Sequence, residues 1–276
     1  MRKGVIFLVP VPIGNLRDIT LRALDVLAGA KLIACEDTRK TAFLLSEHHI
    51  PVPKLISFHK FNERSREDLL FHHLESGEDL VIVSDAGSPA ISDPALAIIR
   101  SAVERNIEIV ALPGPTALIP AFSVAGLGEG KFQFLGFLPV KNNERAAMFE
   151  QLKSYPYPSI IYESVHHLKA TLRAVYHALG DRRVSISREI SKLYEECIRG
   201  LLSELVADFP FTEKGEFVIV IDGAKPHKDP FPNPEAEALL LAFKDVHSKE
   251  LADTLAARFG ITKKEAYSFI IARRKS

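Results

Sequence analysis

Short apolar runs alternate with amphipathic stretches along the first half of the chain. The runs are rich in aliphatic and β-branched side chains and end at Gly, Pro or Asp, as buried strands do. They cover Val5–Pro10, Lys31–Cys35, Asp79–Ser84 and Glu108–Leu112. The stretches that follow them have helical periodicity: Thr20–Leu27, Thr38–His48, Ser65–Glu75 and Pro94–Arg105. This order predicts βαβ units around a parallel sheet.

The second half repeats the alternation. Its predicted strands are Phe132–Phe137, Ser159–Tyr162, Arg183–Ser187 and Glu216–Ile221. The first and the last of these strands lack an obvious helical crossover, so we expect a mixed sheet. The two halves therefore read as two α/β domains, over residues 1–117 and 118–225.

A proline-rich segment and three predicted helices form the end of the chain. Four prolines between 226 and 234 indicate an extended linker. The helices are predicted over Glu235–Lys244, Ser248–Phe259 and Thr262–Arg273. Gly260 is a typical helix end, and Thr262 with Glu265 forms a capping box. Residues 235–276 are thus expected to form a small module similar to a helix-turn-helix.

The composition is that of an ordinary globular protein. With 47% hydrophobic and 25% charged residues over 276 positions, the chain is neither disordered nor fibrous. Two cysteines, Cys35 and Cys197, favour a reducing compartment. The apolar start at Val5–Val9 is too short to span a bilayer. We therefore expect a cytoplasmic protein that does not enter the membrane.

The net charge of zero conceals a strong asymmetry. Residues 76–130 contain seven acidic and two basic side chains, whereas residues 247–276 contain seven basic and three acidic ones. A basic tail is suited to a polyanion, although a solvated charged helix gives the same pattern.

Four polar or glycine-containing loops follow the predicted strands of the first half. They are Val11–Asn15, Glu36–Arg39, Asp85–Pro89 and Pro113–Ala117. Open α/β sheets bind ligands outside the carboxyl ends of their strands. Gly87 and Ser88 can offer backbone N–H groups and a hydroxyl beside the Asp85 carboxylate, which suits an amino-acid moiety or ribose hydroxyls. Helix capping and strand termination would produce similar loops.

Other kinds of site find little support. His72-His73 and His166-His167 are adjacent pairs, and adjacent residues do not share a helix face. No Cys/His spacing is typical of zinc, so we expect no metal. Neither a Walker loop nor a G-x-G-x-x-G fingerprint nor a G-x-S-x-G elbow is present.

Eight stretches resemble one known family. They are VPVPIGNLRDIT (Val9–Thr20), ACEDTRKT (Ala34–Thr41), SDAGSPAISDP (Ser84–Pro94), LPGPTALIPAFSVAGL (Leu112–Leu127), FQFLGFLP (Phe132–Pro139), YESVHHL (Tyr162–Leu168), SREISKLYEE (Ser187–Glu196) and GEFVIVIDG (Gly215–Gly223). In this order they are similar to the bacterial ribose methyltransferases that act on cytidine 1402 of 16S rRNA, in the tetrapyrrole-methylase superfamily.

The resemblance implies a fold and a cofactor. The fold is α/β, with two αβα domains of the tetrapyrrole-methylase (class III S-adenosylmethionine, SAM, methyltransferase) type and a small C-terminal helical module. SAM is expected in the cleft between the two domains of the chain. The protein is expected to form a homodimer. The implied cofactor contacts are Pro12, Gly14, Asp85, Ala86, Gly87, Ser88, Thr116, Ala117, Tyr162, Glu163 and Glu216.

The implied reaction is SAM-dependent methylation of the ribose 2′-hydroxyl of a cytidine in small-subunit rRNA, free or in the assembled 30S subunit. Such a transfer needs alignment of oxygen, methyl carbon and sulfur, and benefits from a base. Glu163 and Glu189 are possible bases, but we expect the cluster of Glu36, Asp37 and Arg39 to be catalytic.

Basic and amide side chains are expected to bind the RNA. A loop from His59 to Arg66 places Phe61 among bases, a mix typical of single-stranded RNA binding. The expected RNA contacts are His59, Asn62, Arg64, Arg188, Lys192, Lys263, Arg273, Arg274 and Lys275. Alternatively, Phe61 belongs to the core, and the segment from Arg188 to Glu196 is an ordinary surface helix with ion pairs.

The sequence is also compatible with two other functions. One is SAM-dependent C-methylation of a tetrapyrrole or another small substrate. The other is a ribosome-associated RNA-binding protein without catalysis, which would not bind SAM.

Overall fold

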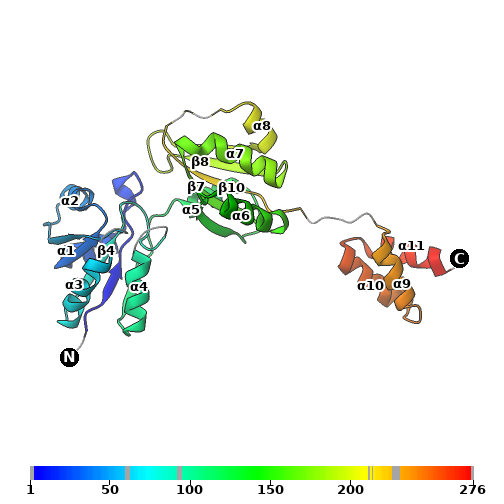
Figure 1. The fold of residues 1–276 in the computed structure, drawn as a ribbon, viewed down its shortest axis with the longest axis horizontal. Helices are drawn as coiled ribbons and strands as arrows, with labels where there is room; N and C mark the ends of the chain where they lie inside the picture. Colours follow the sequence, from blue (N-terminus) through cyan, green and yellow to red (C-terminus); the bar gives the residue numbers. More distant parts are fainter. Residues whose placement is uncertain are drawn as a thin grey trace. The chain divides into compact units, whose positions relative to one another are not determined.

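The computed structural model describes residues 3–59, 63–91, 95–210, 212, 214–225 and 231–274, with side chains from residue 66 onward in the second range. The chain forms two compact units, Met1–Gly223 and Ala224–Ser276 (Figure 1). Among the described residues, none of the helices combines the length and the apolar character needed to cross a bilayer.

The first half of the larger unit contains a five-stranded parallel sheet. Its strands are β1 (Ile6–Leu8), β2 (Leu32–Cys35), β3 (Lys54–Ser57), β4 (Leu80–Val83) and β5 (Ile109–Ala111), in the order β3-β2-β4-β1-β5. The four predicted strands are confirmed, and all their carboxyl ends meet at one edge. The sequence pattern missed β3, because this edge strand is short and only Ile56 in it is buried.

Helices cover both faces of this sheet. They are α1 (Leu21–Gly29), α2 (Thr38–Glu47), α3 (Glu63–Glu75) and α4 (Ala95–Glu104), with a short 3₁₀ turn at Leu16–Asp18. Along β4, Leu80 and Ile82 join a core with α3 and α4, whereas Val81 and Val83 join a core with α1 and α2. This alternation of side chains along a strand produces the αβα sandwich.

The second half of the unit contains a five-stranded mixed sheet. Its strands are β6 (Gln133–Phe137), β7 (Ser159–Ser164), β8 (Arg183–Arg188), β9 (Glu196–Leu201) and β10 (Glu216–Ile221), in the order β6-β7-β10-β8-β9. Only β6 and β7 are parallel, so the mixed sheet is confirmed. Helices α6 (Asn142–Ser154), α7 (Val165–Leu179) and α8 (Leu202–Ala207) share one core with the sheet. Helix α5 (Leu118–Ala125) packs against the other face.

The segment after β8 is a turn and not the alternative surface helix. Arg188 pairs with Glu196 in the antiparallel β8–β9 ladder. Glu189 and Ser191 adopt left-handed φ values of 52° and 69°, which reverse the chain between the two strands. The charged residues between Arg188 and Glu196 are spaced as in a helix, so the sequence pattern did not indicate this turn.

The smaller unit contains three helices, α9 (Pro234–Ala242), α10 (Ser248–Phe259) and α11 (Lys263–Arg274). Gly260 ends α10 with φ 61°, and the Thr262–Glu265 capping box is present, as predicted. Phe231 packs its ring against Phe259 and Phe269 in the core of the unit.

Candidate functional site

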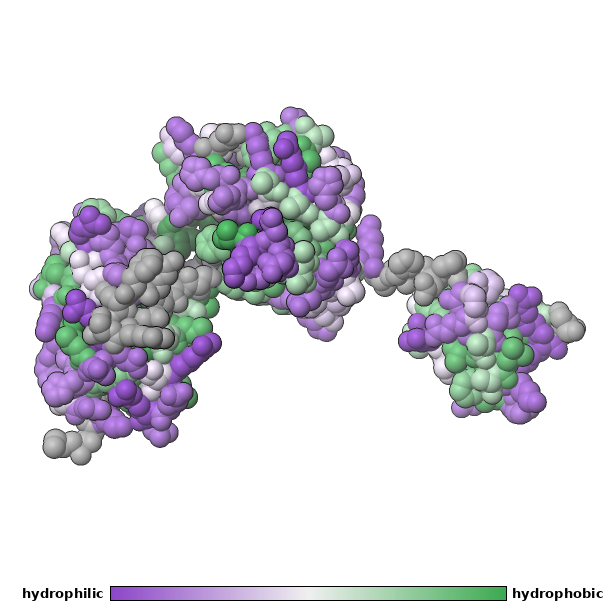
Figure 2. Space-filling view, viewed as in Figure 1, coloured by the Kyte–Doolittle hydropathy of each residue, from purple (hydrophilic) through white to green (hydrophobic). Residues whose placement is uncertain are grey.

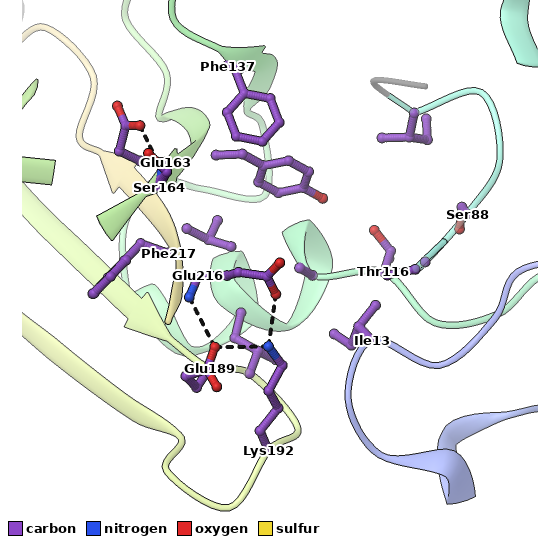
Figure 3. Close-up of a pocket in the computed structure, with 17 residues that line it drawn as sticks. Ile13, Ser88, Thr116, Phe137, Glu163, Ser164, Glu189, Lys192, Glu216 and Phe217 are labelled. Carbon is purple, nitrogen blue, oxygen red and sulfur yellow. Dashed lines mark hydrogen bonds and ion pairs between the residues drawn. The ribbon is translucent and has the colours of Figure 1, made fainter. Parts of the chain in front are cut away.

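Two adjoining cavities lie at the carboxyl edge of the first sheet. The first, which we call the central cavity, has a volume of about 260 Å³. It is lined from both sheets (Figure 3), by Ile13, Ala86, Gly87, Ser88, Ile91, Thr116, Ala117, Phe137, Tyr162, Glu163, Ser164, Glu189, Ile190, Lys192, Glu216, Phe217 and Val218. The second, the α2 cavity, has about 720 Å³ and is lined by the loops after β1 and β4 and by α2. Ile13 and Ala86 line both cavities.

Three strand-end loops are tied into one framework. The backbones of Val11 and Gly87 exchange two hydrogen bonds of 3.0 and 2.9 Å, with Gly87 at φ 76°. The Ser88 hydroxyl donates to the carbonyl of Pro115 at 3.1 Å. We expected the Gly87 N–H to be offered to a ligand, but it is committed to Val11. The sequence could not reveal this, because the bridge joins two segments that are distant along the chain.

Aromatic side chains form the wall of the central cavity on the second sheet. Tyr162 packs edge to face against Phe134 and Phe137, with ring centroids 4.8 and 5.8 Å apart. Burial raises the pKa of Tyr162, although a hydrogen bond with the Thr116 side chain acts in the opposite direction. The phenol therefore stays protonated at neutral pH.

A charged cluster of Lys192, Glu189 and Glu216 forms part of the lining of the central cavity. Lys192 Nζ lies 2.9 Å from Glu189 Oε1 and 2.8 Å from Glu216 Oε2, as the dashed lines in Figure 3 indicate. Burial opposes the charge on Glu189, but hydrogen bonds from Lys192 and the Glu216 amide outweigh it and lower the pKa of Glu189. Gly14 lies against this lysine, since a Cβ there would stand 2.3 Å from Lys192 Cγ.

Glu163 has a structural role in this conformation. Its Oε1 accepts the Ser164 amide at 2.7 Å, and its Oε2 accepts the Thr171 hydroxyl at 2.6 Å. Figure 3 shows the carboxylate turned toward the start of α7 and away from the cavity. Both oxygens are thus occupied in fixing α7 to β7, which argues against Glu163 as the base.

Charged side chains in the α2 cavity are arranged around Asp85. Its carboxylate accepts the Asp37 amide at 2.9 Å and Lys40 Nζ at 2.7 Å. Asp37 caps α2 and binds the Arg39 guanidinium at 3.0 and 2.7 Å, and this contact holds the pKa of Asp37 far below its usual range. Asp37 is therefore a poor proton acceptor near neutral pH. Glu36 Oε1 accepts the Asp85 amide at 3.3 Å.

The residues expected to contact the cofactor divide between the two cavities. Those that line the central cavity are Ala86, Gly87, Ser88, Thr116, Ala117, Tyr162, Glu163 and Glu216. Pro12, Gly14 and Asp85 line the α2 cavity, together with Asp37 and Arg39 of the expected catalytic cluster. The sequence pattern did not distinguish Phe137, Phe217 or Phe43 as site residues, because apolar side chains in strands and helices are typical of cores.

Arg188 does not fit the expected role in RNA binding. The side chain is buried, its Nε donates to the Lys214 carbonyl at 2.6 Å, and its Nη1 lies 2.9 Å from Glu196. The end of β8 turns it inward, so the guanidinium is not presented to a phosphate. Lys192 belongs to the charged cluster described above. His59 follows β3, whereas Asn62, the Arg64 side chain and Lys275 lie outside the described residues.

Several basic groups of the helical unit are also engaged. Lys263 pairs with Asp253 at 2.7 Å, and Arg273 pairs with Glu237 at 2.6 Å. Arg274 donates to the carbonyls of Phe243 and Val246 at 3.0 and 2.8 Å and to the Ser248 hydroxyl at 2.9 Å. On the face in Figure 2, this unit shows a hydrophobic patch flanked by hydrophilic residues. In the part of the chain that the structure describes, no cluster of three or more His, Cys, Asp or Glu could hold a metal ion.

Comparison with known proteins identifies the family to which this fold belongs. The family model of the tetrapyrrole (corrin/porphyrin) methylases matches residues 5–206. A uroporphyrin-III C-methyltransferase from Thermus thermophilus, solved with S-adenosyl homocysteine, has the same fold at 15% identity and a TM-score of 0.56, over 79% of this chain and 97% of that one. The chain belongs to the tetrapyrrole methylase family.

Two curated relatives match almost the whole chain. Both are named ribosomal RNA small subunit methyltransferase I. The protein from Escherichia coli O157:H7 is 36% identical over 99% of this chain and 96% of its own length. The protein from Halalkalibacterium halodurans is 39% identical over 96% of this chain and 94% of its own length. The resemblance to small-subunit rRNA methyltransferases, first read from eight sequence stretches, is thereby confirmed.

Proposed function

We propose that the protein is an S-adenosylmethionine-dependent methyltransferase that modifies the ribose 2′-hydroxyl of a cytidine in 16S rRNA, with cytidine 1402 as the expected position. The names of the full-length relatives support the RNA substrate. One structural observation carries the proposal: the two cavities share Ile13 and Ala86. A methyl donor in the central cavity and a nucleotide in the α2 cavity would meet at this boundary.

The central cavity suits the chemistry of SAM. Its wall combines aromatic and aliphatic groups, which can hold an adenosine, with Ser88, Thr116, Tyr162 and carboxylates that can bind hydroxyl and amino groups. We assign cofactor binding to the expected residues that line this cavity, except the carboxylate of Glu163, which is bound to Ser164 and Thr171. We place Pro12, Gly14 and Asp85 at the boundary with the α2 cavity. When bound, SAM supplies an electrophilic methyl group on a positively charged sulfur.

The residues of the chain would align and deprotonate the acceptor. The ribose 2′ oxygen forms a bond to the methyl carbon, the carbon–sulfur bond breaks with its electron pair going to sulfur, and the hydroxyl proton leaves. Arg39 is held by Asp37 at the cavity and is suited to a phosphate of the RNA. Asp37 is a weak base because Arg39 holds its pKa far below the usual range. We therefore assign proton acceptance to Glu36, which lines neither cavity but accepts the amide of Asp85 beside the α2 cavity.

Methylation mapping of small-subunit RNA tests the function directly. RNA from cells with the gene, without it, and complemented with a Glu36→Gln variant would be compared for 2′-O-methyl cytidine. We expect the mark at one cytidine in the first sample, its loss in the second, and at least a hundredfold slower transfer by the variant in vitro. An unchanged methylation map in cells lacking the gene would refute the proposal.

Two simpler assays separate the competing functions. Labelled SAM would be incubated with undermethylated 30S subunits or with a tetrapyrrole precursor, and transfer to the tetrapyrrole alone would favour C-methylation. A calorimetric titration without SAM binding would favour a non-catalytic RNA-binding protein. We further propose that the protein is cytoplasmic and acts as a homodimer. Sedimentation of the purified protein would then give twice the chain mass of 30.6 kDa.

A further inference from the structure

The α2 cavity contains an exposed aromatic side chain that the fold does not use. Phe43 lies on α2, lines this cavity and is 58% exposed. Its neighbours Leu44 and Leu45 are buried in the core between α2 and the first sheet. A phenylalanine that stays exposed beside two buried leucines gains little from folding. Its position is better explained by a partner that covers the ring.

Cationic groups lie on the same side of α2 as this ring. Arg39 and Lys40 precede Phe43 by four and three residues, and residues at these spacings share one face of a helix. All three line the α2 cavity. The Arg39 side chain is 89% exposed, and that of Lys40 is 62% exposed. An aromatic ring next to two exposed cations is the combination that binds single-stranded RNA, through stacking on the base and pairing with phosphate.

The acidic groups of the cavity are compatible with such a ligand. Asp37 is bound by Arg39, and Asp85 is bound by Lys40 at 2.7 Å and by the Asp37 amide at 2.9 Å. These contacts balance the carboxylates that would otherwise repel a phosphate. They also hold both cations beside the aromatic ring, where they need little reorganisation on binding.

We infer that the α2 cavity takes a single nucleotide withdrawn from its RNA stack, with the base on the Phe43 ring and the flanking phosphate on Arg39 and Lys40. This inference rests on the proposed function and names the residue that positions the target base. Enzymes that act on a base withdraw its nucleotide from the stack in this way, and here the same withdrawal would bring the ribose to the boundary between the cavities. With the base on α2, the ribose lies toward Ile13 and Ala86, where the α2 cavity meets the central cavity.

Substitutions of Phe43 that separate stacking from packing provide the test. Methyl transfer to undermethylated 30S subunits would be measured for the full-length wild type and for Phe43→Ala, Phe43→Leu and Phe43→Tyr, with SAM affinity from calorimetry. We expect kcat/KM for the subunits to fall about 5- to 100-fold in the alanine and leucine variants and to be retained in the tyrosine variant. The affinity for SAM should stay unchanged in all three.

Val103→Ala is the matched control. Val103 is an exposed apolar residue, 62% accessible, on α4 of the same unit, and it lines neither cavity. Equal activity of the leucine variant and the wild type, or full activity of the alanine variant, would overturn the stacking role. If the wild type itself transfers no methyl group to the subunits, the proposed function fails, and the inference fails with it. A loss of SAM binding in the Phe43 variants would assign the residue to the fold and would also overturn the inference.

Discussion

At the scale of single residues, ion pairs fix the groups that surround the two cavities. Lys192 is bound to Glu189 and Glu216, and its pKa is raised because these two carboxylates outweigh the effect of burial. Glu189 reaches this lysine from a left-handed backbone conformation. Strained backbone of this kind is common where a side chain has to be aimed at a functional site.

Acidification should therefore destabilise the protein partly through Glu189. Since the fold lowers the pKa of this carboxyl below the reference value of 4.5, its contribution is complete above that pH and is lost as the pH falls further. In Glu189→Gln, the free energy of unfolding should decrease less than in the wild type between pH 6 and about pH 3. Urea denaturation measures this, and Glu129→Gln, an exposed carboxylate without an ion pair to any described residue, should behave as the wild type does.

A methyl group at Gly14 should disturb the same cluster. Gly14 has φ 151°, and its Cβ would collide with Lys192 Cγ at 2.3 Å. We expect Gly14→Ala to lower the free energy of unfolding by about 1–3 kcal/mol and to weaken SAM binding in calorimetry. Gly29→Ala is the control, because no atom lies within 4 Å of the added carbon and α1 tolerates alanine. Equal losses in both variants would contradict the specific contact.

At the scale of secondary-structure elements, the basic residues of α11 differ in whether they have a partner among the described residues of their own unit. Arg274 donates to the carbonyls of Phe243 and Val246, in the turn between α9 and α10, and to Ser248 at the start of α10. Lys264 is exposed on α11 and has no ion pair with any residue that the structure describes. A count of charges in the tail would assign the same role to every basic residue. The structure shows instead that Arg274 is engaged within the unit and that Lys264 is exposed.

Removal of the Arg274 guanidinium should affect stability. Arg274→Gln removes the donor to the exposed carbonyls of Phe243 and Val246, where water can replace it, so the cost should be about 0.5–1.5 kcal/mol. Hydrogen exchange at the amides of α9 to α11 should show a corresponding loss of protection. Lys249→Gln, at an exposed position without an ion pair to the described residues, should leave exchange unchanged.

Removal of the Lys264 charge should affect RNA binding instead. If this lysine contacts a phosphate, Lys264→Gln weakens binding and reduces the slope of log affinity against log salt by about 1. Filter binding of small-subunit RNA at several salt concentrations measures the slope. A slope equal to that of the wild type would remove Lys264 from the interface.

At the scale of the larger unit, the two sheets contribute different parts of one site. Loops of the first sheet supply the α2 cavity and one wall of the central cavity, and strands β7 and β10 supply the opposite wall. The tip of the β8–β9 hairpin reaches the first half of the chain, where the Ser191 hydroxyl donates to Asp18 and Lys192 packs on Gly14. The central cavity is thus complete only when both halves are folded together.

This division should appear in the kinetics. We expect Lys40→Gln to raise KM for 30S subunits about tenfold with little change in SAM affinity, because Lys40 lines only the α2 cavity. Tyr162→Ala should weaken the affinity for SAM at least tenfold, because the Tyr162 ring forms a wall of the central cavity. Calorimetry measures the SAM affinity of both variants, and steady-state transfer assays measure their KM for 30S subunits. If both variants changed both quantities to the same extent, the two cavities would not bind different ligands.

The order of residues along the chain was sufficient to predict the parallel first sheet, the mixed second sheet, the helical tail and the family. Hydrophobic periodicity reports burial directly, and the four strand-end loops follow from the parallel order of β1, β2, β4 and β5. Which charged groups are free to bind a ligand could be learned only from the folded structure. Arg188 and Arg274 are engaged, Gly87 is paired with Val11, and Phe43 stays exposed, because each depends on a segment far away in the sequence or on the face of α2 that meets the core. Composition and local residue spacing cannot predict contacts between residues that are distant along the chain.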